Sequence, residues 1–558
     1  MSHTLEAAGV LLASGSAAAA LLLPPSPRRS LAMLVALALI PVLLLGNQWH
    51  SSAISDLRDH PARLATAIVI AAAIAISLAL IIRSRPILMP LALIAALPFR
   101  IPLHAGGDQA NLLVPLYLVL AGAVLATAWR QWNDRASLVA DDPEQDSAAS
   151  SAGDARVGDP RRPQAKAEDG GGVPRGRTRG LSAASLLPKL LVAAIVLYAL
   201  QSLYSEDFSR ALQNAAFFYV PFALLYTLLA DCRWDRRLLA AALAVVVAEG
   251  VVFALVGFVE YATRHLLWNH EVITSNDFHT YFRVNSLFWD PNIYGRFMAL
   301  VVTALAAALL WAERERTAIL AVGAGGVLFL GLASTYSQSS FIALLAGLAV
   351  LAALRWSLRW TVLACGGAVL VTLALVLAAG TSLKIDLSKV NSDTSGRANL
   401  ISGGVHLFGD RPLQGYGAGS FGAAYRNHRS HHRAAVTVSH TEPITVGAEQ
   451  GLIGLTLYAA LLITAFATLL GGARTLMPGL RSPPGRAHDA WLVAARAAVL
   501  AAFTALIVHT LFYAGFLEDP ATWVLLAIGA SLAVASSSGE RLEAGSAAPV
   551  TAAALPAR

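Results

Sequence analysis

Apolar stretches of about 20 residues recur along nearly the whole chain. Wound as a helix, each is long enough to cross the roughly 30 Å of hydrocarbon in a lipid bilayer. Many of the stretches lack a charged face, which argues against an alanine-rich soluble helical array. Only 13% of the 558 residues are charged, about half the roughly 25% of a soluble domain. We therefore predict an all-α fold, a polytopic transmembrane helical bundle.

The apolar stretches predict about 12–15 membrane spans, because two of the candidates are weak. The stretch at 87–98 is short and contains two prolines, so we expect it to be broken or tilted. The stretches lie at about 7–23, 31–46, 65–82, 87–98, 112–128, 187–204, 212–230, 237–261, 292–311, 317–334, 340–355, 360–379, 443–470, 491–512 and 521–536.

Short basic connections alternate with less basic ones along the chain, and this alternation indicates sidedness. Lys and Arg collect in short cytoplasmic loops. The basic connections, which we place in the cytoplasm, lie at 27–29, 83–85, 231–237, 312–316, 355–359 and 471–489. Because the net charge of +7 is accounted for by such loops, it does not indicate a nucleic-acid partner.

Composition divides the chain into four regions. Residues 1–128 form N-terminal transmembrane helices, without the basic start and cleavage site of a removable signal peptide. Residues 129–184 are rich in Gly, Pro, Ser, Asp and Arg, so we expect a disordered cytoplasmic linker. Residues 185–540 form the membrane core, which includes the extracytoplasmic loop 380–442, and residues 541–558 form a disordered tail.

The loop 380–442 is the longest polar interruption in the hydrophobic second half of the chain. It contains seven Lys or Arg residues and three Asp residues. Two interpretations of this charge stay open. Long loops escape the positive-inside rule, or the loop contributes an anion site that faces the outer leaflet.

His440 lies just before an apolar helix that we expect to begin near Thr441–Pro443, since proline suits a first helical turn. The partial positive charge of a helix N-terminus favours the neutral imidazole, the form that a general base requires. The alternative is a capping or interfacial histidine.

Arg283 and Arg397 each precede an apolar or amphipathic segment on the predicted outer side. Guanidinium groups bind phosphate oxygens in a bidentate manner and stay charged at any working pH. Together the two arginines could hold a pyrophosphate. The alternative is contact with lipid headgroups, or loop ion pairs with Asp290 or Asp393.

Glu449 lies inside an apolar stretch, where a carboxylate is costly and usually has a partner. Glu449 could hold a nearby arginine or link two helices, and we expect the structural link. Gly447, Gly451 and Gly454 lie at helical spacings that allow another helix to approach closely.

Gly415, Gly417 and Gly419 lack the lysine and the strand–helix context of a nucleotide-binding loop, so we predict a tight turn that returns the loop to the membrane. The histidines at 428, 431 and 432 match no closed metal site, and we predict no metal and no cofactor.

These motifs resemble the O-antigen ligase superfamily over roughly residues 187–540. His440-Thr441, nine further positions and then Gly451-Leu-Ile-Gly454 have the spacing of the ligase signature, with Thr441 where Asn or Ser is usual. SGRANL with DRPLQGYGAGSF resembles the family's arginine segment and glycine turn. FRVNSLFWDPNIYGRFMAL has Ser286 where Gly is common, and STYSQSSFIALLAG has Gln338 where Arg is often found.

The resemblance implies a multi-pass glycosyltransferase of the cytoplasmic (inner) membrane. Its donor would be a glycan on undecaprenyl pyrophosphate in the outer leaflet, and its acceptor a glycan or a lipid. His440 would activate the acceptor hydroxyl for an inverting attack, while Arg283 and Arg397 stabilise the departing pyrophosphate without a metal. Asp290, Asn292 and Glu449 are predicted to support this site. A polysaccharide polymerase of the same superfamily would differ only in its acceptor.

Two more distant alternatives come from other classes. A transporter or flippase requires polar groups near the midplane of the bilayer and often inverted repeats. The sequence shows few such groups, since Glu260, Glu449 and His509 are near span ends or isolated, and it shows no obvious repeat. A metal-dependent glycosyltransferase requires acidic ligands in an outer loop, for which the candidates are Asp56, Asp59, Glu518 and Asp519.

Overall fold

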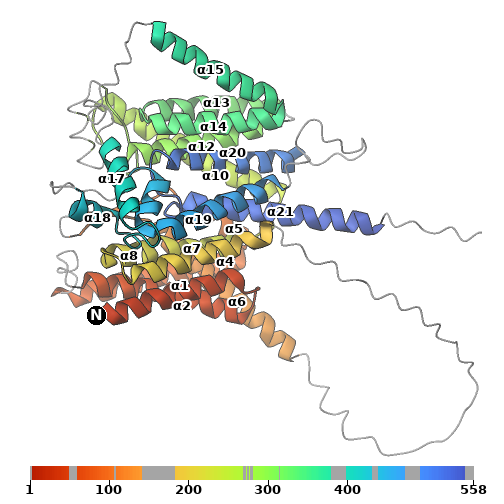
Figure 1. The fold of residues 1–558 in the computed structure, drawn as a ribbon. Helices are drawn as coiled ribbons and strands as arrows, with labels where there is room; N and C mark the ends of the chain where they lie inside the picture. The colour runs from red at the N-terminus through yellow and green to blue at the C-terminus, as the bar shows by residue number, and fades with distance from the viewer. Residues whose placement is uncertain are drawn as a thin grey trace, which may run out of the picture.

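The protein is a bundle of long helices that lie nearly side by side (Figure 1). The computed structural model describes residues 3–49, 59–105, 108–140, 183–267, 272, 276, 281–312, 315–378, 397–429, 438–471 and 490–546. The helices of the first half are α1 (His3–Leu22), α2 (Pro27–Gln48), α4 (Pro61–Ser84), α5 (Leu88–Ala95), α6 (Val114–Ala140), α7 (Ala183–Ser202), α8 (Phe208–Asn214), η1 (Ala215–Tyr219), α9 (Val220–Ala230) and α10 (Arg236–Thr263). Those of the second half are α12 (Pro291–Leu310), α13 (Glu315–Ala333), α14 (Gln338–Arg355), α15 (Leu358–Ala378), α17 (Arg397–Asp410), α18 (Phe421–His428), α19 (Glu442–Leu470), α20 (Ala490–Thr510) and α21 (Pro520–Ser546).

Within the described residues, 12 helices are long and apolar enough to cross a membrane. This number lies within the predicted range and confirms the all-α, polytopic class. α5 has only eight residues, as its two nearby prolines led us to expect. The apolar part of α21, Pro520–Val534, is also shorter than the other candidate spans.

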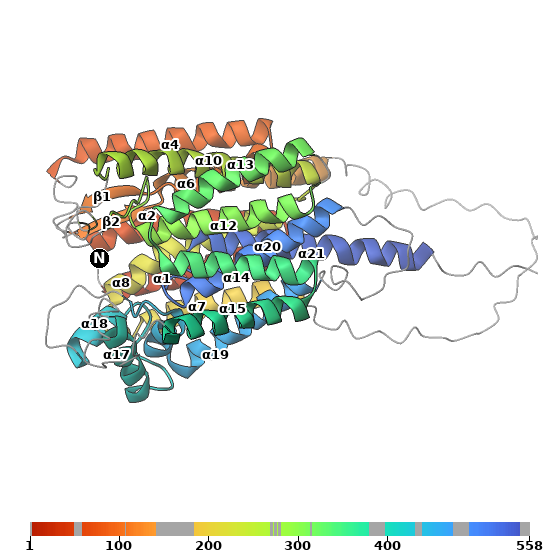
Figure 2. The same cartoon turned by 90° about the horizontal axis from the view of Figure 1, so that it is seen from above.

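A small β-hairpin follows α5 and was not predicted. β1 (Ile101–Ala105) pairs antiparallel with β2 (Asp108–Leu112). Its strands have five residues each, too few for a pattern of alternating side chains to stand out among neighbouring apolar stretches. The hairpin lies at the same end of the bundle as α17 and α18 (Figure 2).

Helix extends slightly into two regions where we expected disorder. α6 continues to Ala140, inside the predicted linker 129–184, and α21 continues to Ser546, inside the predicted tail 541–558. The remainder of both regions, 141–182 and 547–558, lies outside the described residues.

The spans begin where local sequence satisfies the free N–H groups of a first turn. Ser26 caps α2, Asp235 caps α10 and Asp290 caps α12, each through a side-chain oxygen that accepts a backbone N–H. Proline occupies the first position of α2 and α12, where its missing N–H costs nothing. The start of α12 is thereby fixed next to Arg283.

The site is positioned by helices from the second half of the chain. α12 packs against α13, α14 and α20, and α17 packs against α19. A core of aromatic and aliphatic side chains joins α10, α12, α13 and α14, among them Phe253, Tyr294 and Leu328. The N-terminal ends of α12 and α14 and the C-terminal end of α20 thereby come together.

Candidate functional site

His440 occupies a strained turn immediately before α19. Its φ is +65°, a left-handed conformation that is uncommon for a residue with a side chain. Ser439 holds this turn, because its hydroxyl donates to the carbonyl oxygen of Thr441 (2.8 Å) and lies 2.8 Å from the hydroxyl of Thr445. α19 begins at Glu442 with Pro443 in its first turn, as predicted.

The environment of His440 favours its neutral form. Burial lowers the pKa of His440 below the ordinary value of 6.5, the positive charge of Arg397 lowers it further, and Asp290 raises it. We expected the helix N-terminus to act in this direction; burial is the larger cause. The same interactions show that His440, Arg397 and Asp290 lie within electrostatic reach of one another.

Arg283 is held by backbone and side-chain acceptors. Its Nε donates to the carbonyl oxygen of Thr335 (2.9 Å) and its Nη2 donates to Oδ1 of Asn292 (3.1 Å). Burial lowers the pKa of Arg283; Asp290 opposes this shift, and Arg397 adds to it. The two predicted arginines therefore lie near each other, although Arg397 begins α17 and Arg283 precedes α12.

Asp290 caps α12, which argues against the alternative that it forms an ion pair with Arg283. Its Oδ1 accepts the backbone N–H of Asn292 (2.6 Å) and Ile293 (3.4 Å), so it caps α12. Among ion pairs of the described residues, none joins Asp290 to Arg283. Asp393, the other predicted partner, lies outside the described residues.

Asn292 connects Arg283 to a buried hydroxyl cluster at the start of α14. Its Oδ1 also accepts the hydroxyl of Ser337 (2.9 Å), whose oxygen lies 2.8 Å from that of Ser340. Nε2 of His509, on α20, lies 3.3 Å from the hydroxyl oxygen of Ser340. These contacts tie three helices to the guanidinium of Arg283.

Tyr513 and His509 were not identified as site residues from the sequence. The ring of Tyr513 lies 6.2 Å from that of His440 and 5.9 Å from that of His509, centroid to centroid. Burial raises the pKa of Tyr513, Asp290 adds to the rise, and nearby arginines, including Arg397, oppose it. An aromatic residue at a span end is typical of a membrane interface, so sequence alone gave Tyr513 no distinct signal.

α19 is broken at Gly451, and the glycine-rich turn at residues 412–419 packs against this break. Gly451 has φ +65° and ψ −160° inside the helix, which frees the carbonyl oxygens of 448–450 and the N–H groups of 452–453. Residues 412–417 and Gln201 bond these groups, as interrupted membrane helices require. The bonds run from Tyr416 N to Ala448 O (3.1 Å), Gly417 N to Glu449 O (2.8 Å), Gln201 Nε2 to Gln450 O (3.2 Å), Leu452 N to Pro412 O (2.7 Å) and Ile453 N to Leu413 O (3.4 Å).

Glu449 fastens the far side of this turn. Its carboxylate accepts the N–H of Gly419 (2.9 Å) and of Phe421 (3.0 Å). It is a structural link, as expected, and lies on the turn rather than beside His440. Gly415, Gly417 and Gly419 all have positive φ, the conformation that a tight turn requires.

At the three glycines of α19, an added side chain would meet a different neighbour in each case. A side chain at Gly447 would meet Phe408 of α17. One at Gly451 would meet the backbone at Leu413, and one at Gly454 would meet Gln450 of its own helix. Of the three, only Gly447 faces a neighbouring helix, and it does so at an ordinary contact distance (3.4 Å), so the predicted close approach of a helix is not found at these glycines.

The acidic residues that could have served as metal ligands have other partners where the structure describes them. Asp519 forms an ion pair with Arg296, and Glu518 accepts a hydrogen bond from Asn214. Asp56 lies outside the described residues. Within the part of the chain that the structure describes, no three His, Cys, Asp or Glu side chains gather as a metal site.

The basic tract of the loop is partly neutralised at the surface. Arg429 pairs with Asp410, and Arg411 and His428 both face Glu206. These contacts support the interpretation of a solvated tract. His431, His432 and Arg433 lie outside the described residues.

A comparison with protein families finds a match at the centre of this arrangement. Residues 324–459 match the family model described as O-Antigen ligase. This segment of the chain is similar to the O-antigen ligase family. The match confirms the superfamily to which the motifs pointed and supports a membrane glycosyltransferase of the ligase and polymerase family.

The segment that matches the family contains part of the site. It includes Arg397, His440 and Glu449 and extends over the break in α19. Arg283, Asp290 and Asn292 precede it in sequence and reach it through the contacts described above. No curated protein sequence matches the chain.

Proposed function

We propose that the protein transfers a glycan from undecaprenyl pyrophosphate to an acceptor hydroxyl at the outer face of the cytoplasmic membrane. The observation that carries this proposal is the neighbourhood of His440. Burial and the charge of Arg397 lower the pKa of His440, and Arg397 is in turn within electrostatic reach of Arg283. A base next to a binding position for an anionic leaving group is what glycosyl transfer from a pyrophosphate requires.

In the proposed reaction His440 takes the proton of the acceptor hydroxyl. The hydroxyl oxygen then bonds to the anomeric carbon as the bond from that carbon to the pyrophosphate oxygen breaks. Attack from the side opposite the leaving group inverts the anomeric configuration. The electron pair of the broken bond stays on the pyrophosphate, and the imidazolium later releases its proton to water.

Arg283 and Arg397 are proposed to bind the pyrophosphate and to stabilise the charge that grows on it. Charge stabilisation by groups already in place is usually the largest catalytic contribution. The contacts of Arg283 with Thr335 and Asn292 hold it in place before substrate binds. The half-buried setting strengthens its interaction with phosphate, because less water screens it.

The proposal is tested by product analysis with purified protein in lipid nanodiscs. The donor glycan and the acceptor are given different labels, and the products are separated and weighed. We expect one glycan transferred to a separate acceptor, with inverted linkage and with full turnover in EDTA. Transfer between two lipid-linked glycans would instead assign the polymerase reaction, and loss of turnover in EDTA would contradict the arginine-based mechanism.

A further inference from the structure

Four aromatic side chains gather beside Arg283 at the predicted outer end of the bundle. Tyr281 and Phe282 directly precede Arg283 in the chain. Tyr261 lies in the last turn of α10, and Tyr336 lies in the turn between α13 and α14. The rings of Tyr281 and Tyr336 are stacked, with centroids 5.0 Å apart, and those of Tyr261 and Phe282 meet edge to face at 6.4 Å. We call these four residues the aromatic cluster.

The three tyrosines of the aromatic cluster are exposed, whereas its phenylalanine anchors it. Tyr261, Tyr281 and Tyr336 are 37%, 40% and 44% exposed. Phe282 packs against the core that joins α10, α12, α13 and α14. The guanidinium carbon of Arg264 lies 4.5 Å from the centre of the Tyr261 ring and 5.3 Å from that of Phe282. The cluster is therefore fixed from below and open on its outer side.

Tyr336 has a strained backbone. Its φ is +50°, a left-handed conformation that is uncommon for an aromatic residue. Its N–H donates to the carbonyl oxygen of Ala333 (3.2 Å). The next N–H along the chain, that of Ser337, donates to the hydroxyl of Thr335 (3.1 Å). Strain that the surrounding structure maintains in this way is concentrated at functional sites and ligand clamps.

Both stacked rings are connected to Arg283 through a short stretch of backbone. The carbonyl oxygen of Thr335, the residue before Tyr336, accepts Nε of Arg283 (2.9 Å). Tyr281 precedes Arg283 by two residues and lies within electrostatic reach of it. A group that is attached to a phosphate held by Arg283 would therefore come close to these rings. The first sugar of the donor is such a group.

Exposed tyrosine rings suit a sugar chemically. A sugar ring has a face of C–H groups and an edge of hydroxyl groups. The face of an aromatic ring carries the negative part of its quadrupole, which attracts C–H groups laid over it. The hydroxyl of tyrosine both donates and accepts hydrogen bonds, so it can pair with sugar hydroxyls at the edge.

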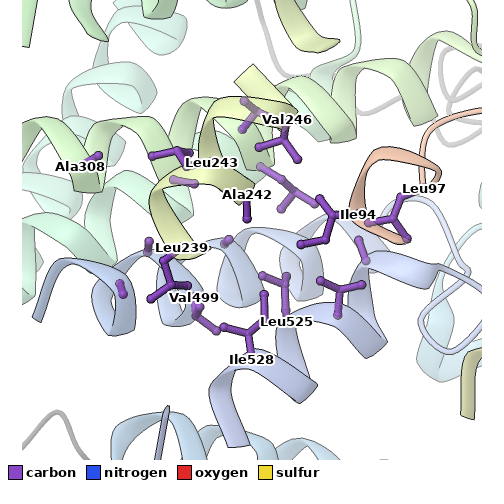
Figure 3. A pocket seen from close by; sticks show the side chains of 18 of the residues that line it. Ile94, Leu97, Leu239, Ala242, Leu243, Val246, Ala308, Val499, Leu525 and Ile528 are labelled. Carbon is purple, nitrogen blue, oxygen red and sulfur yellow. The ribbon is translucent and has the colours of Figure 1, made fainter. Parts of the chain in front are cut away.

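The apolar cavity deeper in the bundle lacks this chemistry. It lies between α5, α10, α12, α20 and α21, and Figure 3 shows mainly aliphatic side chains around it, such as Leu243, Val246 and Leu525. Sugar hydroxyls buried against an aliphatic wall would lose their hydrogen bonds, which is costly. Among the described residues that line the cavity, none belongs to the aromatic cluster.

We propose that Tyr281 and Tyr336 bind the first sugar of the donor glycan by stacking, while Arg283 holds the pyrophosphate to which that sugar is attached. This inference rests on the proposed function. It follows from the exposure of the rings, the strained turn and the backbone connection to Arg283. Anchoring in the lipid headgroup region, where aromatic residues are common, accounts for the exposure alone.

The test compares the binding of two lipids to the full chain in nanodiscs, without an acceptor. One is glycan-free undecaprenyl pyrophosphate, and the other is undecaprenyl pyrophosphate that carries a single N-acetylglucosamine. The dissociation constant of the first divided by that of the second, here the sugar ratio, measures what the sugar adds to affinity. The affinity for the glycan-free lipid reports whether the fold and Arg283 are intact.

The variants separate the aromatic ring from the other properties of these side chains. Tyr281→Leu removes a ring but keeps an apolar side chain, whereas Tyr281→Phe keeps the ring and removes the hydroxyl. Tyr336→Gly removes the second ring at a positive φ that glycine adopts freely. Trp49→Leu is the matched control, because Trp49 follows α2 at a predicted outer connection and is 38% exposed.

We expect the wild type to bind the sugar-carrying lipid about three- to tenfold more tightly than the glycan-free lipid, as one aromatic contact allows. Tyr281→Leu and Tyr336→Gly should bring the sugar ratio close to one and leave the affinity for the glycan-free lipid unchanged. Tyr281→Phe should retain most of the sugar ratio, and Trp49→Leu all of it.

Three outcomes would overturn the proposal. The first is a wild-type sugar ratio in both Tyr281→Leu and Tyr336→Gly. The second is a sugar ratio near one in the wild type. The third is an equal loss of affinity for both lipids in Tyr281→Leu and Tyr336→Gly, which would show that the rings support Arg283 or the lipid and not the sugar.

The same measurements distinguish this inference from the proposed function. A sugar ratio that depends on Tyr281 in a protein without transferase activity would support the sugar site while contradicting the proposed reaction. Glycan transfer by a protein whose sugar ratio does not depend on Tyr281 or Tyr336 would do the reverse.

Discussion

At the scale of single residues, His440 combines a left-handed backbone with a lowered pKa. Strained backbone conformations cost about 1–3 kcal/mol and persist where the surrounding structure enforces them. Here Ser439 and Thr445 hold the turn through their hydroxyls. The strain and the burial together set a neutral imidazole at the mouth of α19, where a hydroxyl group could reach it.

The protonation of His440 predicts a pH dependence. An imidazolium cannot accept a proton, so kcat/KM should fall as the pH drops through a pKa that lies below 6.5. Asp290 raises that pKa, so Asp290→Asn should lower it and move the acid limb of the pH–rate profile to lower pH. Asparagine still caps a helix, so α12 should remain intact. An acid limb that moves to higher pH would contradict the role of this histidine.

Asn292 predicts a positioning effect on donor binding. Asn292→Ala removes the acceptor for Nη2 of Arg283, and a hydrogen bond to a charged group contributes about 1.5–3 kcal/mol. We expect KM for the donor to rise about tenfold or more, with a smaller change in kcat. Asn292→Asp retains the oxygen and is the control; equal kinetics in wild type and Asn292→Ala would show that Arg283 is positioned without it.

The chemistry of individual residues explains which site residues could be identified from the sequence. His440, Arg283 and Arg397 stood out because each lies in a motif that resembles the O-antigen ligase superfamily, and because imidazole and guanidinium groups suit base and phosphate-binding roles. His509 did not, because a histidine near a span end reads as an interfacial residue. Its connection to Arg283 passes through two serines and an asparagine, and only packing brings those together.

At the scale of elements, the interrupted α19 and the turn at 412–419 form one unit. Each supplies the backbone partners that the other lacks. The sequence pattern around Gly451 predicted a glycine with close contacts but not a break. Glycine is common in unbroken membrane helices, so the residue type alone could not separate the two cases.

Gly451→Ala should be markedly destabilising. The added methyl group would meet the backbone at Leu413. The conformation of Gly451 (φ +65°, ψ −160°) is essentially restricted to glycine and alone costs another residue about 1–3 kcal/mol. We expect a lower melting temperature and loss of transfer, measured by thermal denaturation in detergent. Gly323→Ala on α13 is the matched control, since its methyl group would meet no atom within 4 Å; equal melting temperatures in the two variants would contradict the break.

At the scale of the whole molecule, the apolar stretches sufficed to predict a helical bundle, because a bilayer imposes one solution on such segments. The hairpin β1–β2 was not predicted because its five-residue strands are too short to show an alternating pattern. The joint action of Arg283 and Arg397 was proposed from their chemistry, whereas their mutual approach depends on tertiary contacts between segments far apart in sequence. The Arg29–Asp231 pair (2.8 Å) likewise joins α2 to the end of α9.

The sidedness inferred from basic loops predicts different labelling at the two ends of the bundle. Leu413 and Trp356 have similar exposed fractions, 60% and 62%, but belong to predicted outer and inner connections. In a background with Cys232 and Cys365 changed to serine, Leu413→Cys should react with a membrane-impermeant maleimide on intact cells and Trp356→Cys should not. The opposite pattern would place His440 in the cytoplasm.

The most direct measurement compares donor binding and glycan transfer in the same preparations of wild type, His440→Gln and Arg397→Gln. We predict that His440→Gln binds undecaprenyl pyrophosphate with unchanged affinity and transfers no glycan, whereas Arg397→Gln loses both. Glycan transfer by His440→Gln at the wild-type rate would contradict the assignment of His440 as the base at this site.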